Sequence, residues 1–218
     1  MSLDPHTHVS VRAGQGIIHG LPTASPDKDP IIQFQEWFDL AQDTNVYLPE
    51  AMTLATASSD GSPSARIVLL KHVDHRGFVF FTNYHSRKGD ELKSNPRAAL
   101  VVHWSTLQRQ IRIEGNVEQI SKDENETYFQ SRPRGSRIGA WASRQSMPLS
   151  ERSELDMRLE QFNKKYPGKD IPCPPHWGGF RVIPEKIEFW QGRKDRLHER
   201  LIFNRLPSKD WQTKLLYP

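Results

Sequence analysis

The chain has 218 residues and a net charge of +4, and its 36% hydrophobic content and mean hydropathy of −0.69 are low but still typical of one globular domain. No apolar stretch approaches the roughly 18 residues of a membrane span, the N-terminus lacks the apolar segment of a signal peptide, and the single cysteine excludes a disulfide framework. We therefore expect a cytoplasmic protein without a membrane partner. The mild basic excess suits small phosphorylated ligands as well as nucleic acid, but no basic run or RNA-binding signature supports nucleic acid.

The first half of the chain reads as an arm, a helix and several strands. Residues 1–28 are rich in Pro, Gly, Ser, Thr and His without a sustained period and predict a flexible arm, which leaves 29–218 as the folded domain. Asp29 followed by Pro30 predicts the start of a helix, and apolar residues then recur at helical spacing. Strands are predicted at about 52–57, 64–72 and 78–81, with turns at 59–61 and 74–77, and a hairpin of 98–104 and 109–120.

The second half begins with two predicted helices, at about 121–131 and 150–166, the second with Ser150 as its N-cap. After a Pro-rich loop, strands are predicted near 179–183, 186–191, 196–203 and 211–215. Short sequential strands with tight turns favour antiparallel pairing and closure into a barrel, whereas a parallel α/β fold would need crossover helices that are absent here. The sequence therefore predicts a mainly β (α+β) fold, a β-barrel with peripheral helices.

The most informative stretch runs from Arg196 to Arg200. In a strand over 196–203, the side chains of Arg196, His198 and Arg200 would share one face at about 7 Å spacing, while the alternate residues are apolar and fill the other face. Three cationic or potentially cationic groups on one face repel one another unless an anion lies among them. A solvated edge strand is the alternative, and the other basic motifs of the chain favour a ligand.

A second constellation is Ser86-Arg87-Lys88. Ser86 is typical of a helix N-cap, yet the first turn then carries two cations, which oppose the helix dipole. A phosphate bound at the helix N-terminus would remove this conflict, because it accepts both the backbone N–H bonds and the two side chains. A solvated first turn is an equally good interpretation of this segment alone.

Weaker signals accompany these two. Arg66 and Lys71 lie at the ends of one predicted strand with opposite parity, so they are not expected to contact the same group. The segment 131–136 carries two arginines that could clamp a phosphate, although Arg-rich loops are usually solvated. The N-terminal histidines lack the compact ligand set of a metal site, and 177–179 are expected to be packing and turn residues.

A series of collinear motifs runs from about residue 30 to the C-terminus. The motifs are Arg66–Lys71, Phe81–Asn83, Ser86–Lys88, Arg109–Gln110, Ser131–Arg134, Ile138–Trp141, Arg144–Ser146, Trp177–Gly179, Glu188–Gly192 and Arg196–His198. This series resembles the pyridoxamine 5'-phosphate oxidase family. The resemblance implies a split β-barrel homodimer with FMN at the subunit interface, and it places a dimerisation region at the C-terminal end of the 29–218 domain.

The family's functional positions transfer to this chain residue by residue. The resemblance assigns FMN binding to Arg66, Ile67, Val68, Leu69, Phe81, Thr82, Arg87, Lys88, Gln110, Gln145, Ser146, Trp190 and Arg200. It assigns the substrate phosphate to Lys71, Tyr128, Arg132 and Ser136, and the pyridine ring and reacting carbon to the catalytic pair Arg196 and His198.

The implied reaction is oxidation at the 4'-carbon of pyridoxamine or pyridoxine 5'-phosphate to pyridoxal 5'-phosphate. A hydride passes to flavin nitrogen 5, O2 reoxidises the flavin to give H2O2, and the amine substrate releases ammonia after hydrolysis. The flavin carries the hard step and the protein supplies orientation. Our hypothesis is that His198 orients the substrate and is not an obligatory base.

Two departures from the family pattern and two alternative functions qualify this interpretation. The arm offers Arg12 but no tyrosine for the expected contact over the substrate, and Leu215 stands where the family has an arginine. The alternatives are another FMN split-barrel reductase that uses NAD(P)H and a non-catalytic protein that binds FMN or pyridoxal phosphate. Oxygen consumption and NAD(P)H-dependent flavin reduction distinguish the three.

Overall fold

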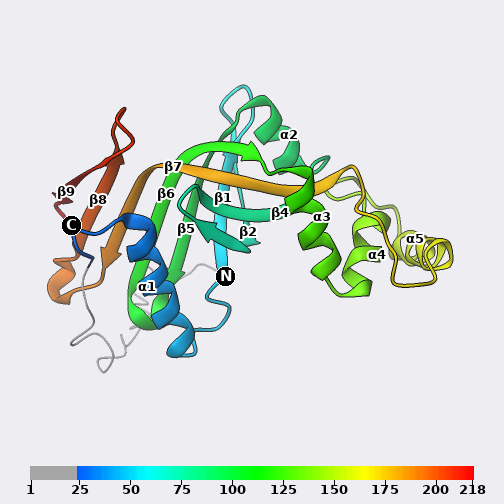
Figure 1. Ribbon diagram of the computed structural model, residues 1–218, viewed down its shortest axis with the longest axis horizontal. Helices are drawn as coiled ribbons and strands as arrows, with labels where there is room; N and C mark the ends of the chain where they lie inside the picture. Colours follow the sequence, from blue (N-terminus) through cyan, green and yellow to red (C-terminus); the bar gives the residue numbers. More distant parts are fainter. Residues whose placement is uncertain (1–23) are drawn as a thin grey trace, which may run out of the picture.

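The computed structural model describes residues 24–218, so the predictions for Arg12 and for the N-terminal histidines lie outside the described residues. A single antiparallel sheet dominates this part of the chain, in the order β2-β1-β5-β6-β7-β4-β3, with β8 paired to β7 and β9 to β8 (Figure 1). The strands are β1 (Ala51–Ala57), β2 (Pro63–Leu69), β3 (His72–Asp74), β4 (Gly77–Asn83), β5 (Arg97–Trp104), β6 (Arg109–Gln119), β7 (Trp177–Gln191), β8 (Glu199–Arg205) and β9 (Trp211–Leu216).

Helices flank the sheet, and the predicted mainly β fold with peripheral helices is confirmed. The helices α3, α4 and α5 gather at one end of the sheet, opposite the hairpin of β8 and β9 (Figure 1). None of the helices in the described residues is both long and apolar enough to cross a membrane. The helices are α1 (Pro30–Asp43), α2 (Arg87–Ser94), α3 (Lys122–Ser131), α4 (Arg134–Ala142) and α5 (Arg152–Lys165), with short 3-10 turns η1 (Ser105–Leu107) and η2 (Lys194–Arg196).

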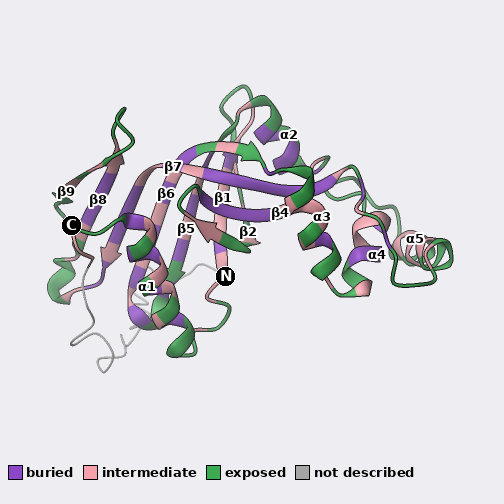
Figure 2. Ribbon diagram, viewed as in Figure 1, coloured by how far each residue is buried: buried purple, intermediate pink, exposed green. Residues whose placement is uncertain are grey.

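The main core lies between α1 and one face of the curled sheet. Buried and partly exposed residues alternate along β1, as the period of a strand requires, and Met52 and Leu54 point inward. Phe34 of α1 packs edge-on against Phe78 of β4, with their ring centroids 4.9 Å apart. Figure 2 shows this buried layer running through the strands, whereas α5 has no buried residue.

The predicted strands 179–183 and 186–191 are one continuous strand, β7. The expected break at Pro184 is absent because β6 and β7 shift register between Glu114 and Gly115, which places Gly115 opposite Pro184. A Cβ at Gly115 would lie 1.9 Å from the carbonyl oxygen of Ile183, so only glycine fits there. Trp177 to Gly179 also belong to β7 and not to a turn.

The strand predicted at 196–203 begins only at Glu199. Asp195 and Arg196 adopt left-handed backbone conformations, with φ of 56° and 61°, which fold the chain into η2. Consequently Arg196, His198 and Arg200 do not share a strand face, and of the three only Arg200 lies in β8. The alternation of charged and apolar residues is real, but a strand cannot pass through two left-handed residues.

Helix starts were predicted well where a side-chain cap exists. The Asp29 carboxylate accepts from the backbone N–H of Ile31 at 2.8 Å, and Ser86 occupies the N-cap of α2, as predicted. The N-cap of α5 is Glu151 and not Ser150, and no side chain caps this helix. The sequence patterns do not predict α4, whose N-cap Pro133 cannot supply the capping side chain that marks a helix start.

Candidate functional site

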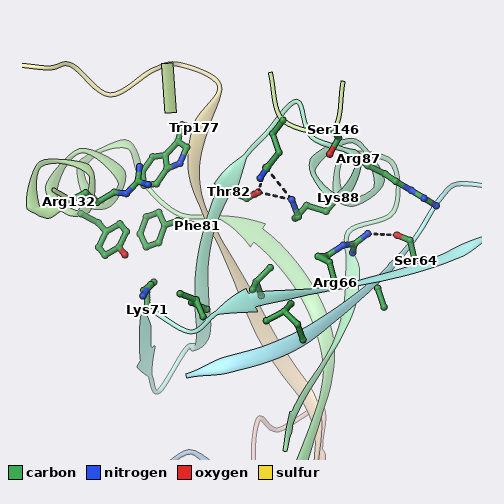
Figure 3. Close-up of a pocket in the computed structure, with 16 residues that line it drawn as sticks. Ser64, Arg66, Lys71, Phe81, Thr82, Arg87, Lys88, Arg132, Ser146 and Trp177 are labelled. Atoms are coloured by element: carbon green, nitrogen blue, oxygen red, sulfur yellow. Dashed lines mark hydrogen bonds between the residues drawn. The ribbon is translucent and has the colours of Figure 1, made fainter. Parts of the chain in front are cut away.

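A cavity of about 610 Å³ lies where the edge strand β2 approaches β4, α2 and α3 (Figure 3). Thirteen of the predicted cofactor and substrate residues line it, and they come from segments that are far apart in the sequence. Its lining residues are Ser64, Ala65, Arg66, Ile67, Val68, Leu69, Lys71, Phe81, Thr82, Arg87, Lys88, Tyr128, Arg132, Gln145, Ser146 and Trp177.

Lys88 is a buried cation at one end of this cavity. Its residue is 8% exposed, and its ammonium group donates to Thr82 Oγ1 at 3.1 Å, Ser86 Oγ at 3.2 Å and Gln145 Oε1 at 3.2 Å. All three acceptors are uncharged. Burial, and secondarily the nearby Arg66, lower the pKa of Lys88. An anion in the cavity would therefore relieve a charge that the protein leaves without full compensation.

Arg66 and Arg87 stand beside Lys88 at the same end of the cavity (Figure 3). Arg66 reaches from β2 toward α2, and both arginines form ion pairs with Glu91, at 3.2 Å and 2.8 Å. Ser146, also in the lining, has a φ of 72°, which is unusual for a residue other than glycine. Such backbone conformations concentrate at binding sites, so Ser146 supports a functional cavity.

The opposite end of the cavity is built on stacked rings. Phe81 and Tyr128 stack with centroids 3.9 Å apart, and Phe81 and Trp177 stack at 5.2 Å. The guanidinium of Arg132 lies 4.5 Å from the Trp177 ring centroid, and burial lowers the pKa of Arg132. Its Nη1 is buried and has no hydrogen-bond partner among the described residues. This end therefore also presents a cation with unused donors.

Lys71 and Arg66 lie at opposite ends of this one cavity (Figure 3). Lys71 follows β2, which ends at Leu69, and it stands with Tyr128 and Arg132 at the ring-stacked end. The arrangement agrees with the expectation that Arg66 and Lys71 do not contact the same group. The cavity thus has two separate cationic ends.

The segment 131–136 divides its arginines between two roles. Arg132 lines the cavity, whereas Arg134 donates to the carbonyls of Gly168 at 3.1 Å and Tyr166 at 2.6 Å. Arg134 therefore holds the chain that follows α5, and the segment does not act as a clamp of two arginines. Ser136, in the first turn of α4, is exposed and does not line the cavity.

The other predicted residues outside the cavity, except Ser136, form a second group on the outer face of the sheet and beside it. Gln110, Trp190 and Arg200 are direct cross-strand neighbours on β6, β7 and β8. The ring of His198 lies 4.6 Å from that of Trp190, and Arg196 is exposed beside them in η2. This second group does not line the cavity. Three strand spacings, roughly 14 Å, separate β2 from β6 along the sheet.

Sequence reasoning missed three members of the cavity and one carboxylate behind it. Ser64, Ala65 and Trp177 line the cavity without having been predicted to do so, and Trp177 is also packed as expected. Glu91 contacts Arg66 and Arg87 but was not singled out. The spacing of four residues between Arg87 and Glu91 on one helix predicts their ion pair from the sequence. The contact of Glu91 with Arg66 joins residues far apart in the chain, so no local pattern predicts it.

Two consecutive parts of the chain each match a model of a known protein family. Residues 39–166 match the family model described as pyridoxamine 5'-phosphate oxidase, and residues 177–218 match the pyridoxine 5'-phosphate oxidase C-terminal dimerisation region. The chain belongs to the pyridoxamine 5'-phosphate oxidase family. Two relatives named pyridoxine/pyridoxamine 5'-phosphate oxidase show how much of the family's length it shares. The Psychromonas ingrahamii protein is 54% identical over 94% of each chain, and that of Cupriavidus necator is 55% identical over 87% of this chain and 89% of its own.

Solved structures support the split-barrel fold. PhzG from Burkholderia lata, in complex with tetrahydrophenazine-1-carboxylic acid, superposes with a TM-score of 0.87 and 33% identity, covering 93% of this chain and all of its own. A pyridoxamine 5'-phosphate oxidase-related, FMN binding protein from Nostoc punctiforme has a TM-score of 0.70 at 18% identity, covering 88% of this chain and 99% of its own, and supports the fold alone.

Proposed function

We propose that this protein binds FMN and oxidises pyridoxamine and pyridoxine 5'-phosphate to pyridoxal 5'-phosphate, with O2 as the electron acceptor and H2O2 as its product. The observation that carries the proposal is a single cavity with a cationic group at each end, Lys88 with the two arginines at one and Lys71 with Arg132 at the other (Figure 3). Two phosphorylated ligands, a flavin and a vitamer, match this arrangement. Family relatives above 50% identity carry the corresponding name.

The residues of the Lys88 end fit the flavin phosphate. A dianion there would accept from Lys88, Arg66 and Arg87 and would compensate a buried ammonium whose present partners are all uncharged. In the part of the chain that the structure describes, β2 is an edge strand that pairs only with β1. Its outward backbone groups at 67–69 therefore border the cavity and can bind the polar edge of a flavin ring. When bound, FMN supplies hydride acceptance from substrate and electron transfer to oxygen.

The Lys71 end would hold the phosphate of the substrate. Lys71 and Arg132 supply charge, and the Tyr128 hydroxyl supplies a further donor at the same wall. The unused Nη1 of Arg132 gains a partner when an anion enters, which favours phosphate over an uncharged ligand. The stack of Phe81, Tyr128 and Trp177 keeps this wall flat and apolar beside the charges.

A homodimer would bring the second group of residues to the cavity. In a two-fold dimer both subunits use the same surface to contact each other. The cavity of one subunit can therefore be completed by the second group of residues from the other subunit. Trp190, Arg196, His198 and Arg200 all fall in the region 177–218 that matches the dimerisation model. We infer that Gln110, Trp190 and Arg200 of the second subunit complete the flavin site, and that its Arg196 and His198 face the substrate.

His198 is set up to orient and not to remove a proton. Its Nδ1 lies 3.2 Å from the backbone nitrogen of Arg193 and accepts that N–H, which leaves the proton of a neutral ring on Nε2. A His198→Asn variant keeps a side-chain donor, so we expect kcat to fall by less than about a hundredfold. Steady-state turnover of pyridoxine 5'-phosphate measures this. A loss of about 10⁴-fold would establish general-base catalysis instead.

The function itself is tested by the visible spectrum of the purified protein. Anaerobic addition of pyridoxamine 5'-phosphate should bleach the flavin band at roughly 450 nm, and admission of O2 should restore it with formation of H2O2. Reduction by NAD(P)H without reduction by the vitamer would favour a reductase. A bound flavin that neither donor reduces would indicate a carrier protein. A purified protein without flavin would contradict the proposal that it is an FMN-dependent oxidase.

A further inference from the structure

Glu91, on α2, is a nearly buried carboxylate just behind the Lys88 end of the cavity. Its side chain is 6% exposed and receives four donors. Thr56 Oγ1 donates to its Oε2 at 2.5 Å and Ser64 Oγ at 2.7 Å. Arg66 Nη2 lies 3.2 Å from Oε2, and Arg87 Nε lies 2.8 Å from Oε1. Glu91 itself does not line the cavity, so it acts through the residues that do.

The network around Glu91 is closed. Thr56 and Ser64 donate to the carboxylate and, through the same hydroxyl oxygens, accept from Arg66 Nη1 and Nη2. Burial acts to raise the pKa of Glu91, but hydrogen bonds from Ser64, Thr56, Arg87 and Arg66 outweigh it and lower the pKa to about 2. The carboxylate is therefore ionised at neutral pH and fixes the plane of the Arg66 guanidinium.

We propose that Glu91 is a positioning residue for the flavin phosphate, holding Arg66 and Arg87 in place beside Lys88 before the cofactor arrives. An arginine side chain that is already ordered loses less conformational freedom on binding an anion. The negative charge of Glu91 also lowers the affinity for a phosphate, because the two like charges repel. Glu91 lies behind Arg66, with its charge engaged by two guanidinium groups and two hydroxyls, so orientation outweighs repulsion. The inference rests on the proposed function, since it presumes that the ligand is FMN.

Riboflavin separates this role from a merely structural one, because it has the flavin ring but no phosphate. We would titrate FMN and riboflavin into flavin-free wild type, Glu91→Ala and Glu91→Gln and follow flavin fluorescence. Glu91→Ala should lose about tenfold or more of the FMN preference, with riboflavin affinity unchanged within about threefold. Glu91→Gln keeps an acceptor oxygen for Ser64, Thr56 and Arg66 but turns an N–H toward the Arg87 Nε donor, so it should lose less of the preference than Glu91→Ala.

A matched control is Glu124→Ala. Glu124 also bonds two arginines, Arg76 at 3.0 Å and Arg181 at 3.2 Å, but it lies outside the lining of the cavity, so the FMN preference should stay as in wild type. An equal loss of both flavins in Glu91→Ala would overturn the inference and leave a structural role. A gain in FMN preference in both Glu91 variants would overturn it in favour of repulsion. A wild type without FMN preference would overturn the proposed flavin site as well.

Discussion

Lys88 and Arg132 are cations at the two ends of one cavity, and the protein holds them by different means. Lys88 sits among hydroxyl and amide oxygens, whereas Arg132 is held against the face of Trp177. Among the described residues, no carboxylate forms an ion pair with either of them, so both keep charge available for a ligand. Arg66 and Arg87 differ, because Glu91 holds them. Residue chemistry thus distinguishes arginines that a carboxylate holds from an arginine that is stacked on a ring.

Trp177 should control the affinity for the phosphorylated substrate. A Trp177→Leu variant removes the ring under Arg132, and we expect KM for pyridoxine 5'-phosphate to rise about five- to thirtyfold with a smaller change in kcat. Steady-state kinetics measure this, and a melting curve reports the cost of changing a buried side chain. Trp211→Leu is the control, since Arg205 lies 4.8 Å over Trp211 far from the cavity. An unchanged KM in Trp177→Leu would contradict the role.

At the scale of elements, one buried arginine ties three segments together near the ring-stacked end of the cavity. Arg181 of β7 is 1% exposed and pairs with Asp74, at the end of β3, at 2.7 Å and with Glu124 of α3 at 3.2 Å. Arg76 bridges the same two carboxylates, each at 3.0 Å. The capping box of α3, in which Ser121 and Glu124 bond reciprocally, uses one of these carboxylates. The position of Tyr128, on α3, therefore depends on this network.

This network makes stability depend on pH in the acid range. Burial acts to raise the pKa of Asp74, but hydrogen bonds from Arg76 and the charge of Arg181 outweigh it, so its pKa lies below the ordinary 3.8. Hydrogen bonds from Ser121 lower the pKa of Glu124 below 4.5. A carboxyl group whose pKa is lower in the folded protein than in the unfolded chain stabilises the fold at pH values above its unfolded pKa. This stabilisation is lost as the pH falls through the pKa of the folded state.

An Asp74→Asn variant tests this dependence. The melting temperature of the wild type should decrease as the pH is lowered below about 4.5, because the unfolded chain binds protons more readily than the folded protein in this range. The variant should melt at a lower temperature than wild type at pH 7, and the difference should shrink as pH falls toward 3. Differential scanning calorimetry across this range measures it. A difference that is constant with pH would show that Asp74 contributes packing and not charge.

At the scale of the whole molecule, the outer face of the sheet is a continuous surface built from rows of cross-strand neighbours. Ile67, Thr53, Val101 and Arg112 form one such row across β2, β1, β5 and β6. Gln110, Trp190 and Arg200 belong to the next row on the same face. Small and partly exposed side chains dominate β1 and β5 there, so a second sheet can approach closely.

We expect Val101→Arg to disrupt the proposed homodimer. A long cation in the middle of this face would be buried without a partner, which costs several kcal/mol in an interface. Sedimentation velocity should show a monomer, and FMN should dissociate because the second group no longer reaches the cavity. Ile32→Arg is the control, since Ile32 is 58% exposed on α1, which packs against the opposite face of the sheet. A dimer that persists in Val101→Arg would contradict this placement of the interface.

The sequence by itself determined what local interactions decide. Asp29 and Ser86 mark helix starts because a side-chain cap acts within three residues, and the alternation along β1 and β5 marks buried strands because the period of a strand is local. The collinear motifs then implied the family and the residues of the cavity. Thirteen of those residues do line it.

Only the tertiary structure decided what depends on long-range contacts. The bulge between β6 and β7 keeps Pro184 inside a strand, and η2 takes Arg196 out of one. Trp177 contacts Arg132 although the two residues are far apart in the sequence. Glu91 of α2 likewise accepts a hydrogen bond from Thr56 of β1. Register, curl and closure are set by contacts between residues far apart in the chain, which no local pattern encodes. For that reason the sequence named the candidate residues, whereas the fold divided them between a cavity and a separate face.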